Sequence, residues 1–204
     1  MDKTHTRPRV AFQGERGAFS EEAALSLLGA EIELVPRATF DALFAAVEEG
    51  AADYALAPVE NTLAGPVARV RELLAASALQ IVAEVNLPVA QHLVGCAGAT
   101  LAGLRRVESH PVALRQCERF FAAHPHIERA EADDTAASVR RVVARGDPTC
   151  AAIASARAAQ IYGAQILRAH VEDNAENHTR FVLLAVTVGS TQSATTSARS
   201  FTQS

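Results

Sequence analysis

The sequence of 204 residues has no tryptophan, and aromatic residues make up only 5% of it. Apolar residues still account for 49%, so we expect a core of alanine, valine, leucine and isoleucine. No apolar run approaches the roughly 20 residues that a membrane-spanning helix needs. The N-terminal segment, Met1–Arg9, is polar and does not fit a secretory signal. These absences predict a cytoplasmic globular protein with no membrane partner.

Positive charge is also scarce, since 19 Lys and Arg residues stand against 23 Asp and Glu residues, for a net charge of −4. That balance argues against a nucleic-acid partner. Cysteines are few, widely spaced and free of any Cys-x-x-Cys pattern: Cys96, Cys117 and Cys150. We expect them to be reduced thiols rather than a disulfide or zinc framework.

Signatures of metal, nucleotide and covalent chemistry are missing as well. Gly14–Gly17 follows an apolar run, but it is neither a dinucleotide fingerprint nor a Walker A loop, so a tight turn is favoured over an anion-binding loop. The pair His124 and His126, and His170 with Glu172, have neither helical nor zinc-finger spacing. There is no Gly-x-Ser-x-Gly elbow. We therefore expect no metal and no cofactor.

Short apolar runs alternate with amphipathic runs along most of the chain. The predicted strands are Arg9–Gln13, Ile32–Val35, Tyr54–Pro58, Gln80–Val85, Arg105–Glu108, Cys150–Ala154, Gln165–His170 and Thr179–Val188. The predicted helices are Ser20–Leu28, Thr39–Glu49, Ala64–Ala75, one opened by Pro111, one from Asp134 or Thr135 to about Arg145, and Ser155–Tyr162. This alternation predicts an α/β protein with mostly parallel sheets and helices on their faces.

Two segments interrupt the alternation and suggest two lobes. Glu84–Gly95 is long and extended, with Pro88 inside it, and Glu172–His178 is polar and aperiodic. We expect the chain to cross between lobes there, with a ligand cleft between the lobes. Lobe 1 is predicted to comprise residues 8–85 and 179–189, lobe 2 residues 86–178, and residues 190–204 a disordered tail.

Three polar clusters lie at the ends or starts of predicted strands: Pro58–Gly65, Ser109–Pro111 followed by Gln116–Cys117, and Asn177–Phe181. Gln116 lies about a turn and a half into the helix of the second cluster. Ligands of open α/β sheets collect at the carboxyl ends of strands, and a cluster at a strand start suits a hinge that enters the cleft. The structural alternatives are a turn former at Asn61, a helix cap at Ser109 and a surface charge at Arg180.

Six motifs in one order carry a family resemblance over about residues 9–188. They are Gly14-x-x-Gly17-Ala-Phe-Ser20, Asp53 to Gly65 with Glu60-Asn61-Thr62, Ser109-His110-Pro111-x-Ala113-Leu114-x-Gln116-Cys117, Asp134-Thr135-Ala136, Ala151 to Ala159, and Asn177-x-Thr179-Arg180-Phe181. Together they resemble the prephenate dehydratase family, lyases of phenylalanine biosynthesis. Two positions depart from the usual pattern, with Thr62 in place of Ser and Val112 in place of Gln.

The resemblance implies a clamp of two α/β lobes, like a type II periplasmic-binding protein, with the active site between the lobes. It implies a carbon–oxygen lyase that converts prephenate to phenylpyruvate with loss of water and CO2. The catalytic residues that it implies are Thr179, Asn61, Gln116 and Glu60. The substrate-binding residues that it implies are Arg180, Phe181, Thr62, Ser109 and His110, and we add Thr135, Gly17 and Ser20 because they are expected at helix N-termini.

Because this reaction creates an aromatic ring, it needs no cofactor. The protein must supply a proton or strong hydrogen bond to the departing hydroxyl, typically worth about 10²–10⁴-fold, and an anchor for the pyruvyl carboxylate. Arg180 is the natural carboxylate anchor, assisted by backbone N–H groups near Gly17–Ser20 or Thr135. A threonine hydroxyl is a weak acid, so we expect Thr179 to act as an oriented donor or as a relay from water, Glu60 or His110.

Two alternative functions also fit this sequence. One is an arogenate dehydratase, because arogenate differs from prephenate only by a side-chain amino group. The other is a non-catalytic clamp that binds a small anion. The sequence lacks the regulatory domain that usually follows in this family, so we expect no feedback inhibition by phenylalanine through such a domain. A homodimer through the catalytic lobes is the expected assembly.

Overall fold

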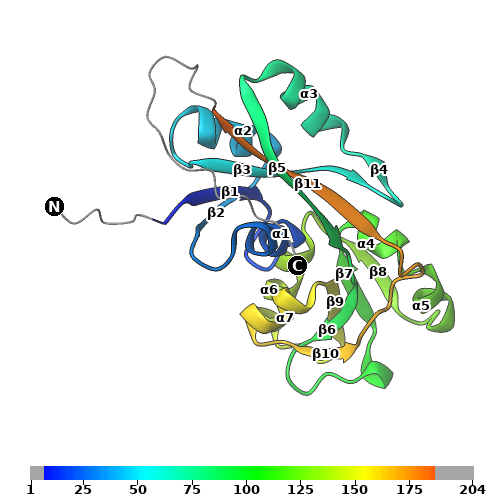
Figure 1. The fold of residues 1–204 in the computed structure, drawn as a ribbon. Helices are drawn as coiled ribbons and strands as arrows, with labels where there is room; N and C mark the ends of the chain where they lie inside the picture. The colour runs from blue at the N-terminus through cyan, green and yellow to red at the C-terminus, as the bar shows by residue number, and fades with distance from the viewer. Residues whose placement is uncertain (1–6, 187–204) are drawn as a thin grey trace, which may run out of the picture.

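The structure is a computed structural model that describes residues 7–186. Two separate sheets with helices on their faces form two lobes (Figure 1). The strands are β1 (Arg9–Gln13), β2 (Glu33–Arg37), β3 (Tyr54–Asn61), β4 (Gly65–Pro66), β5 (Leu79–Pro88), β6 (His92–Gly95), β7 (Arg106–Ser109), β8 (Glu128–Glu131), β9 (Cys150–Ala154), β10 (Gln165–Arg168) and β11 (His178–Val186). The helices are α1 (Phe19–Leu28), α2 (Phe40–Glu48), α3 (Ala68–Ala76), α4 (Pro111–Arg115), α5 (Glu118–Ala123), α6 (Thr135–Arg145) and α7 (Ala156–Tyr162), with a 3-10 turn at Leu101–Gly103.

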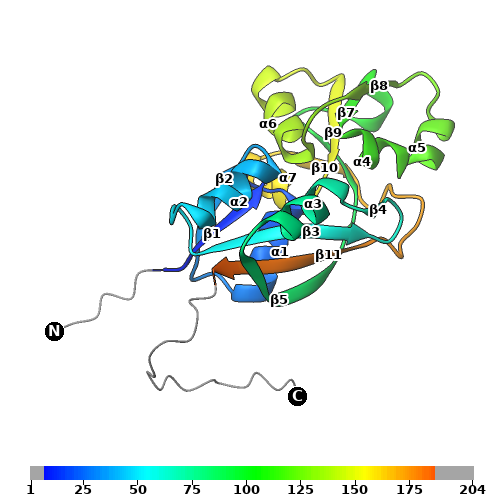
Figure 2. The ribbon, with the colours of Figure 1, turned by 90° about the horizontal axis from the view of Figure 1, so that it is seen from above.

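The first lobe is the sheet β2-β1-β3-β11-β5, with β4 paired to β3, and its helices α1–α3. The second lobe is the sheet β10-β6-β9-β7-β8 with α4–α7. The chain passes between the sheets at residues 89–91 and 169–177, which we call the first and second crossings. Figure 2 shows β5 and β11 lying side by side in opposite directions, with the arrow of β11 pointing away from the second lobe.

The two-lobed α/β fold is confirmed, but both sheets are mixed rather than mostly parallel. β1 pairs in parallel with β2 and β3, and β7 with β8 and β9. β11 is antiparallel to β3 and β5, and β6 is antiparallel to β9 and β10. The physical reason is that β6 and β11 each arrive from the other lobe. They therefore start at the end of the sheet where their neighbours finish.

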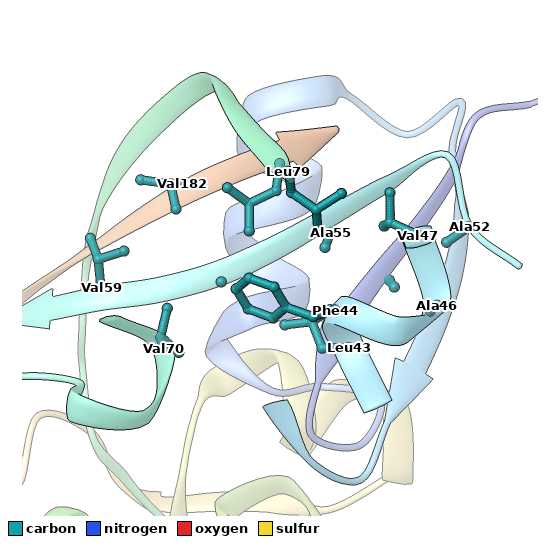
Figure 3. Close-up of a cluster of buried hydrophobic side chains, with 13 residues drawn as sticks. Leu43, Phe44, Ala46, Val47, Ala52, Ala55, Val59, Val70, Leu79 and Val182 are labelled. Carbon is teal, nitrogen blue, oxygen red and sulfur yellow. The ribbon is translucent and has the colours of Figure 1, made fainter. Parts of the chain in front are cut away.

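Each sheet buries side chains on both faces because alternate strand residues point to opposite sides. On β11, Val182 and Leu184 belong to the cluster under α2 and α3, whereas Phe181 and Leu183 belong to the cluster under α1. Figure 3 shows the first of these clusters, with Phe44 of α2 packed beneath the strands. Two further clusters fill the two faces of the second lobe. Each lobe is therefore built around two small hydrophobic cores.

Several predicted boundaries were wrong for identifiable reasons. The short polar strand β8 was missed because an edge strand need not be apolar, and β6 was hidden inside the extended Glu84–Gly95 run. Gln116 is not inside a helix but is the C-cap of α4. A new helix starts after it because the Asp173 carboxylate accepts from the N–H groups of Glu118 (2.7 Å) and Arg119 (2.9 Å).

The predicted lobe boundaries at 85/86 and 178/179 stay a prediction. The predicted tail, residues 190–204, and the last residues of the predicted final strand, 187–188, lie outside the described residues.

Candidate active site

A cavity of about 460 Å³ lies between the lobes, within the size range typical of small-ligand sites. Its walls come from both lobes and from the first crossing. The polar or titratable side chains that line it are Gln13, Ser20, Asn61, Gln91, His110, Gln116, Asp133, Asp134, Thr135 and Thr179. Seven predicted site residues line this cavity: Ser20, Asn61, His110, Gln116, Thr135, Thr179 and Phe181.

The Thr179 hydroxyl has a fixed orientation at the start of β11. Thr179 pairs directly with Asn61 across the sheet, and Asn61 Nδ2 donates to Thr179 Oγ1 at 2.9 Å. Within residues 7–186, Thr179 donates to no protein acceptor, so its proton remains available to a ligand in the cavity. Phe181, two residues along the same face, is 2% exposed and packs into the core under α1. This packing anchors the strand that carries Thr179.

A chain of side-chain amides continues from Asn61 into the second lobe. Asn61 Nδ2 donates to Asn177 Oδ1 at 2.8 Å, and Asn177 Nδ2 donates to Gln116 Oε1 at 3.0 Å. Gln91 Nε2 donates to the same Gln116 oxygen at 3.2 Å. Gln91 lies in the first crossing and Asn177 in the second. We call these five residues, Gln91, Gln116, Asn177, Asn61 and Thr179, the amide chain.

His110 presents a further donor. Its Nδ1 accepts from the N–H of Val112 at 3.2 Å, which assigns the proton of a neutral ring to Nε2.

Helix N-termini add backbone donors at the cavity wall. The N-cap of α1 is Ala18, whose side chain cannot cap the helix, and Ser20 in its first turn lines the cavity. Thr135 opens α6, where Asp134 Oδ1 caps the N–H of Ala137 at 2.7 Å.

Among the described residues that line the cavity, none is lysine or arginine, and two are aspartates. The cavity therefore offers neutral donors and the partial positive charge of helix N-termini to an anionic group, without a full cation. Asp133 and Asp134 offer acceptors on the same wall.

Arg180 and Glu60 lie outside the cavity, contrary to prediction. Because side chains alternate along β11, Arg180 points to the face opposite Thr179, where it pairs with Glu84 (3.4 Å) and Glu60 (3.7 Å). The side chains of Arg180 and Glu60 are 42% and 51% exposed. Direct anchoring of a carboxylate in the cavity by Arg180, and a proton relay from Glu60, do not fit this arrangement.

Two other predicted residues, Ser109 and Thr62, support the site from outside the cavity. Ser109 is fully buried and donates to the carbonyl of Ile153 at 2.6 Å, joining β7 to β9. Thr62 Oγ1 accepts from the N–H of His178 at 3.0 Å and donates to the carbonyl of Glu176 at 3.1 Å, so it holds the second crossing. These hydroxyls have structural roles.

At Gly17 the backbones of the two lobes lie close together. Its φ is +89°, and a Cβ there would lie 2.7 Å from the Ala158 Cα at the start of α7. Ser155 Oγ donates to the Gly17 carbonyl at 2.8 Å. Only glycine fits such a backbone at such a distance. Gly17 therefore sets how closely the two lobes meet.

Ion pairs surround this contact. The carboxylate of Glu21 is buried and accepts from the N–H of Gly17 (2.9 Å), from Arg16 (2.7 Å) and from Arg157 of the second lobe (2.7 Å). Burial raises the pKa of Glu21, but the hydrogen bonds from Arg16, Gly17 and Arg157 outweigh it and leave the pKa below its ordinary value.

A second, more exposed pair joins the lobes beside it. Arg140 of α6 donates to Glu15 at 2.7 and 2.8 Å, and this bond lowers the pKa of Glu15. We call the contacts of Glu15 and Glu21 with Arg140 and Arg157, together with Gly17, the ionic contact.

Two functional candidates were missed by the list of site residues taken from the sequence. Gln91 is 2% exposed and Asn177 fully buried, yet both are polar and join the amide chain. Asn177 stands in the last of the six motifs, which was a usable signal. Gln91 follows an extended apolar run and carried no signal, because only the fold brings it to Gln116.

Within residues 7–186, no group of three or more His, Cys, Asp or Glu side chains is arranged to hold a metal ion. The same part of the chain contains no helix with the length and hydrophobicity to span a membrane. Its three cysteines are buried and unpaired.

Comparison with known proteins identifies relatives along almost the whole described chain. A family model for prephenate dehydratase matches residues 10–188. The chloroplastic arogenate dehydratase/prephenate dehydratase 2 of Arabidopsis thaliana is 42% identical over 180 residues, which are 88% of this chain and 47% of the relative.

Two solved structures are also similar. Prephenate dehydratase from Arthrobacter aurescens, in complex with L-Phe, has a TM-score of 0.82 and 28% identity, covering 92% of this chain and 63% of that one. A protein described as a novel type of quorum quenching acylase has a TM-score of 0.80 and 35% identity, covering 91% of this chain and 66% of that one. The chain spans less than half the length of the Arabidopsis relative. Because the family model covers nearly all described residues, this chain belongs to the prephenate dehydratase family.

Proposed function

We propose that this chain is a carbon–oxygen lyase that converts prephenate to phenylpyruvate, with loss of the ring hydroxyl and CO2, in phenylalanine biosynthesis. The observation that carries the proposal is the Thr179 hydroxyl. It accepts from Asn61 at 2.9 Å, and its own proton is free to meet a ligand in a cavity between two lobes.

The cavity residues supply what the reaction needs. As the bond to the ring carboxylate breaks, its electron pair enters the ring and the C–O bond to the hydroxyl breaks. Thr179 donates a hydrogen bond to the departing oxygen, which carries the developing negative charge. Asn61 fixes the direction of that donor, because Thr179 Oγ1 is already engaged as an acceptor. A proton supplied through His110 or water then completes the loss of water.

Anchoring must leave the departing carboxylate destabilised. Neutral donors from Gln116 and His110, and the helix N-termini at Ser20 and Thr135, line the cavity, and no lysine or arginine does so among the described residues. We propose that the pyruvyl carboxylate binds at a helix N-terminus. The ring carboxylate then meets no full positive charge, so losing its negative charge as CO2 costs little electrostatic stabilisation.

Arogenate is a second candidate substrate, and one observation favours it. Asp133 and Asp134 line the cavity. A carboxylate within a few ångströms of the side-chain ammonium of arogenate would stabilise it, and the keto group of prephenate has no such partner. The Arabidopsis relative is named for both activities.

The remaining candidates have less support. Amide hydrolysis, suggested by the acylase relative, needs an activated nucleophile. Within residues 7–186, no histidine or carboxylate accepts a hydrogen bond from Thr179. A non-catalytic clamp would bind prephenate without turnover. The cytoplasmic location and the homodimer stay predictions, and several relatives are named as chloroplastic.

The test measures phenylpyruvate formation from prephenate, and phenylalanine formation from arogenate, with the purified chain. The Arg180→Gln variant serves as a matched control, because Arg180 follows Thr179 on β11 but lies outside the cavity. We expect turnover of at least one substrate, with kcat of Arg180→Gln within about threefold of the wild type. Binding of both substrates without turnover of either would refute the proposal and support the clamp.

A further inference from the structure

The amide chain has a fixed polarity, which originates in the backbone. Asn61 Oδ1 accepts from the N–H groups of Leu63 at 3.0 Å and Ala64 at 2.8 Å. The two hydrogens of its Nδ2 are shared among three oxygens within hydrogen-bond distance: the carbonyl of His178, Asn177 Oδ1 and Thr179 Oγ1. A reversed amide would place an oxygen against the carbonyl of His178 and an NH2 group against two backbone N–H donors. The orientation of Asn61 is therefore determined.

This orientation determines the next two amides. Because Asn177 Oδ1 accepts from Asn61, Asn177 Nδ2 faces Gln116 Oε1, to which it donates at 3.0 Å. Gln91 Nε2 donates to the same oxygen. Asn177 is fully buried, so no water competes for its side chain. The orientation of each amide therefore determines that of the next, from Asn61 in the first lobe through Asn177 in the second crossing to Gln116 in the second lobe.

The result at the far end is a donor at the cavity wall. Since Oε1 of Gln116 is occupied by two donors, its Nε2 is the end of the amide left for a ligand. Within residues 7–186 this NH2 group donates to no protein acceptor, and Gln116 lines the cavity. The matching ligand group is a hydrogen-bond acceptor, such as a carboxylate or keto oxygen.

We propose that Asn177 is a positioning residue, which holds the amide of Gln116 with its NH2 group toward the cavity and so presents a donor to an acceptor oxygen of the substrate. The kinetic test of this inference rests on the proposed function. The orientation of the amides does not depend on that function. Asn177 touches no cavity wall, since it is absent from the lining residues, and acts only through its two neighbours.

Removing Asn177 leaves its partners bonded. In Asn177→Ala, Asn61 Nδ2 keeps the His178 carbonyl and Thr179 Oγ1, and Gln116 Oε1 keeps Gln91. No hydrogen-bonding group of these partners becomes an orphan, so we expect the variant to fold. Asn86→Ala is the matched control, because Asn86 is an exposed asparagine on β5 outside the cavity.

The kinetic test is a double-mutant cycle between Asn177 and Gln116. Asn177→Ala alone is expected to lower kcat/KM about tenfold, the size of one well-placed hydrogen bond. In a Gln116→Ala background it should change kcat/KM by less than about twofold, because its target is gone. Equal, additive losses in both backgrounds would overturn the proposal, since a merely structural residue behaves that way. Asn86→Ala should match the wild type.

A second measurement does not depend on turnover. In protein labelled with ¹⁵N at Asn and Gln, with signals assigned from the Asn177→Ala and Gln116→Ala variants, hydrogen exchange reports each NH2 group. We expect slow exchange for Asn61 and Asn177 and fast exchange for Gln116. Protection of the Gln116 NH2 group with fast exchange at Asn177 would overturn the polarity. If the wild type processes neither substrate, the proposed function fails, and this exchange pattern still decides the inference.

Discussion

The two lobes meet through two regions of different chemistry. The amide chain joins them with neutral groups whose hydrogen bonds are directional and whose charge does not change with pH. The ionic contact joins them with carboxylates and guanidinium groups around a glycine that has no room for a side chain. Residues next to each of these regions line the cavity. We propose that the two regions have different roles: the amide chain orients hydrogen-bond donors toward the substrate, and the ionic contact holds the lobes together.

The largest effect on kcat is expected for a substitution of Asn61, whose orientation determines that of the other amides in the amide chain. Asn61→Asp keeps the oxygen that accepts from Leu63 and Ala64, but it removes the donor to Asn177, His178 and Thr179. A carboxylate facing these acceptors should lower kcat by about 10² or more, in line with the loss of an oriented acid–base group. Steady-state kinetics measures this. A kcat within threefold of the wild type would show that Asn61 does not orient Thr179.

The next largest effect, on the free energy of unfolding, is expected at Gly17, where the backbones of the two lobes lie close together. Gly17→Ala places a Cβ 2.7 Å from the Ala158 backbone at a φ of +89°, so the lobes must separate or the loop must distort. We expect a loss of about 2–4 kcal/mol in the free energy of unfolding, measured by urea denaturation. Gly146→Ala is the control, because its φ is +65° but nothing lies within 4 Å. Equal losses in both variants would mean that backbone strain alone is responsible.

A smaller effect is expected at Glu21. Glu21→Gln keeps the shape of the side chain but removes the charge that pairs with Arg16 and Arg157, and should cost about 1–3 kcal/mol at neutral pH. Because the folded-state pKa of Glu21 is lowered, its contribution is complete above the ordinary glutamate pKa of about 4.3 and is lost as the pH falls through the folded-state pKa. Stability curves of the wild type and the variant should therefore converge in acid. A constant difference down to about pH 2 would contradict this account.

The smallest effect is expected at Arg140. Its pair with Glu15 is more exposed, with 52% and 37% of the two side chains accessible. Arg140→Gln should lower the free energy of unfolding by only about 0.2–1 kcal/mol, and 0.5 M NaCl should reduce that difference. The amide-chain variant Asn177→Ala should show no comparable salt dependence. Equal salt sensitivity of both variants would remove the distinction between the two regions.

The two-lobed fold and seven residues of the cavity wall could be predicted from the sequence, because the alternation of strands and helices and the six motifs are local signals. Sequence reasoning could not determine which way a strand residue faces. Thr179, Arg180 and Phe181 form one motif, yet alternation sends Thr179 into the cavity and Arg180 out of it. Gln91 and Gln116 are 25 residues apart and meet only because the first crossing lies against α4. The mixed sheets follow from the crossings, which composition does not encode.

The most direct measurement compares kcat and substrate binding in Thr179→Val and Thr179→Ser. Valine has the shape of threonine without its hydroxyl, and serine restores the hydroxyl. We predict that Thr179→Val loses most of kcat while its dissociation constant for prephenate stays within a few-fold of the wild type. We also predict that Thr179→Ser retains substantial activity. Near-normal kcat in Thr179→Val would contradict the claim that this hydroxyl is the oriented donor to the leaving group.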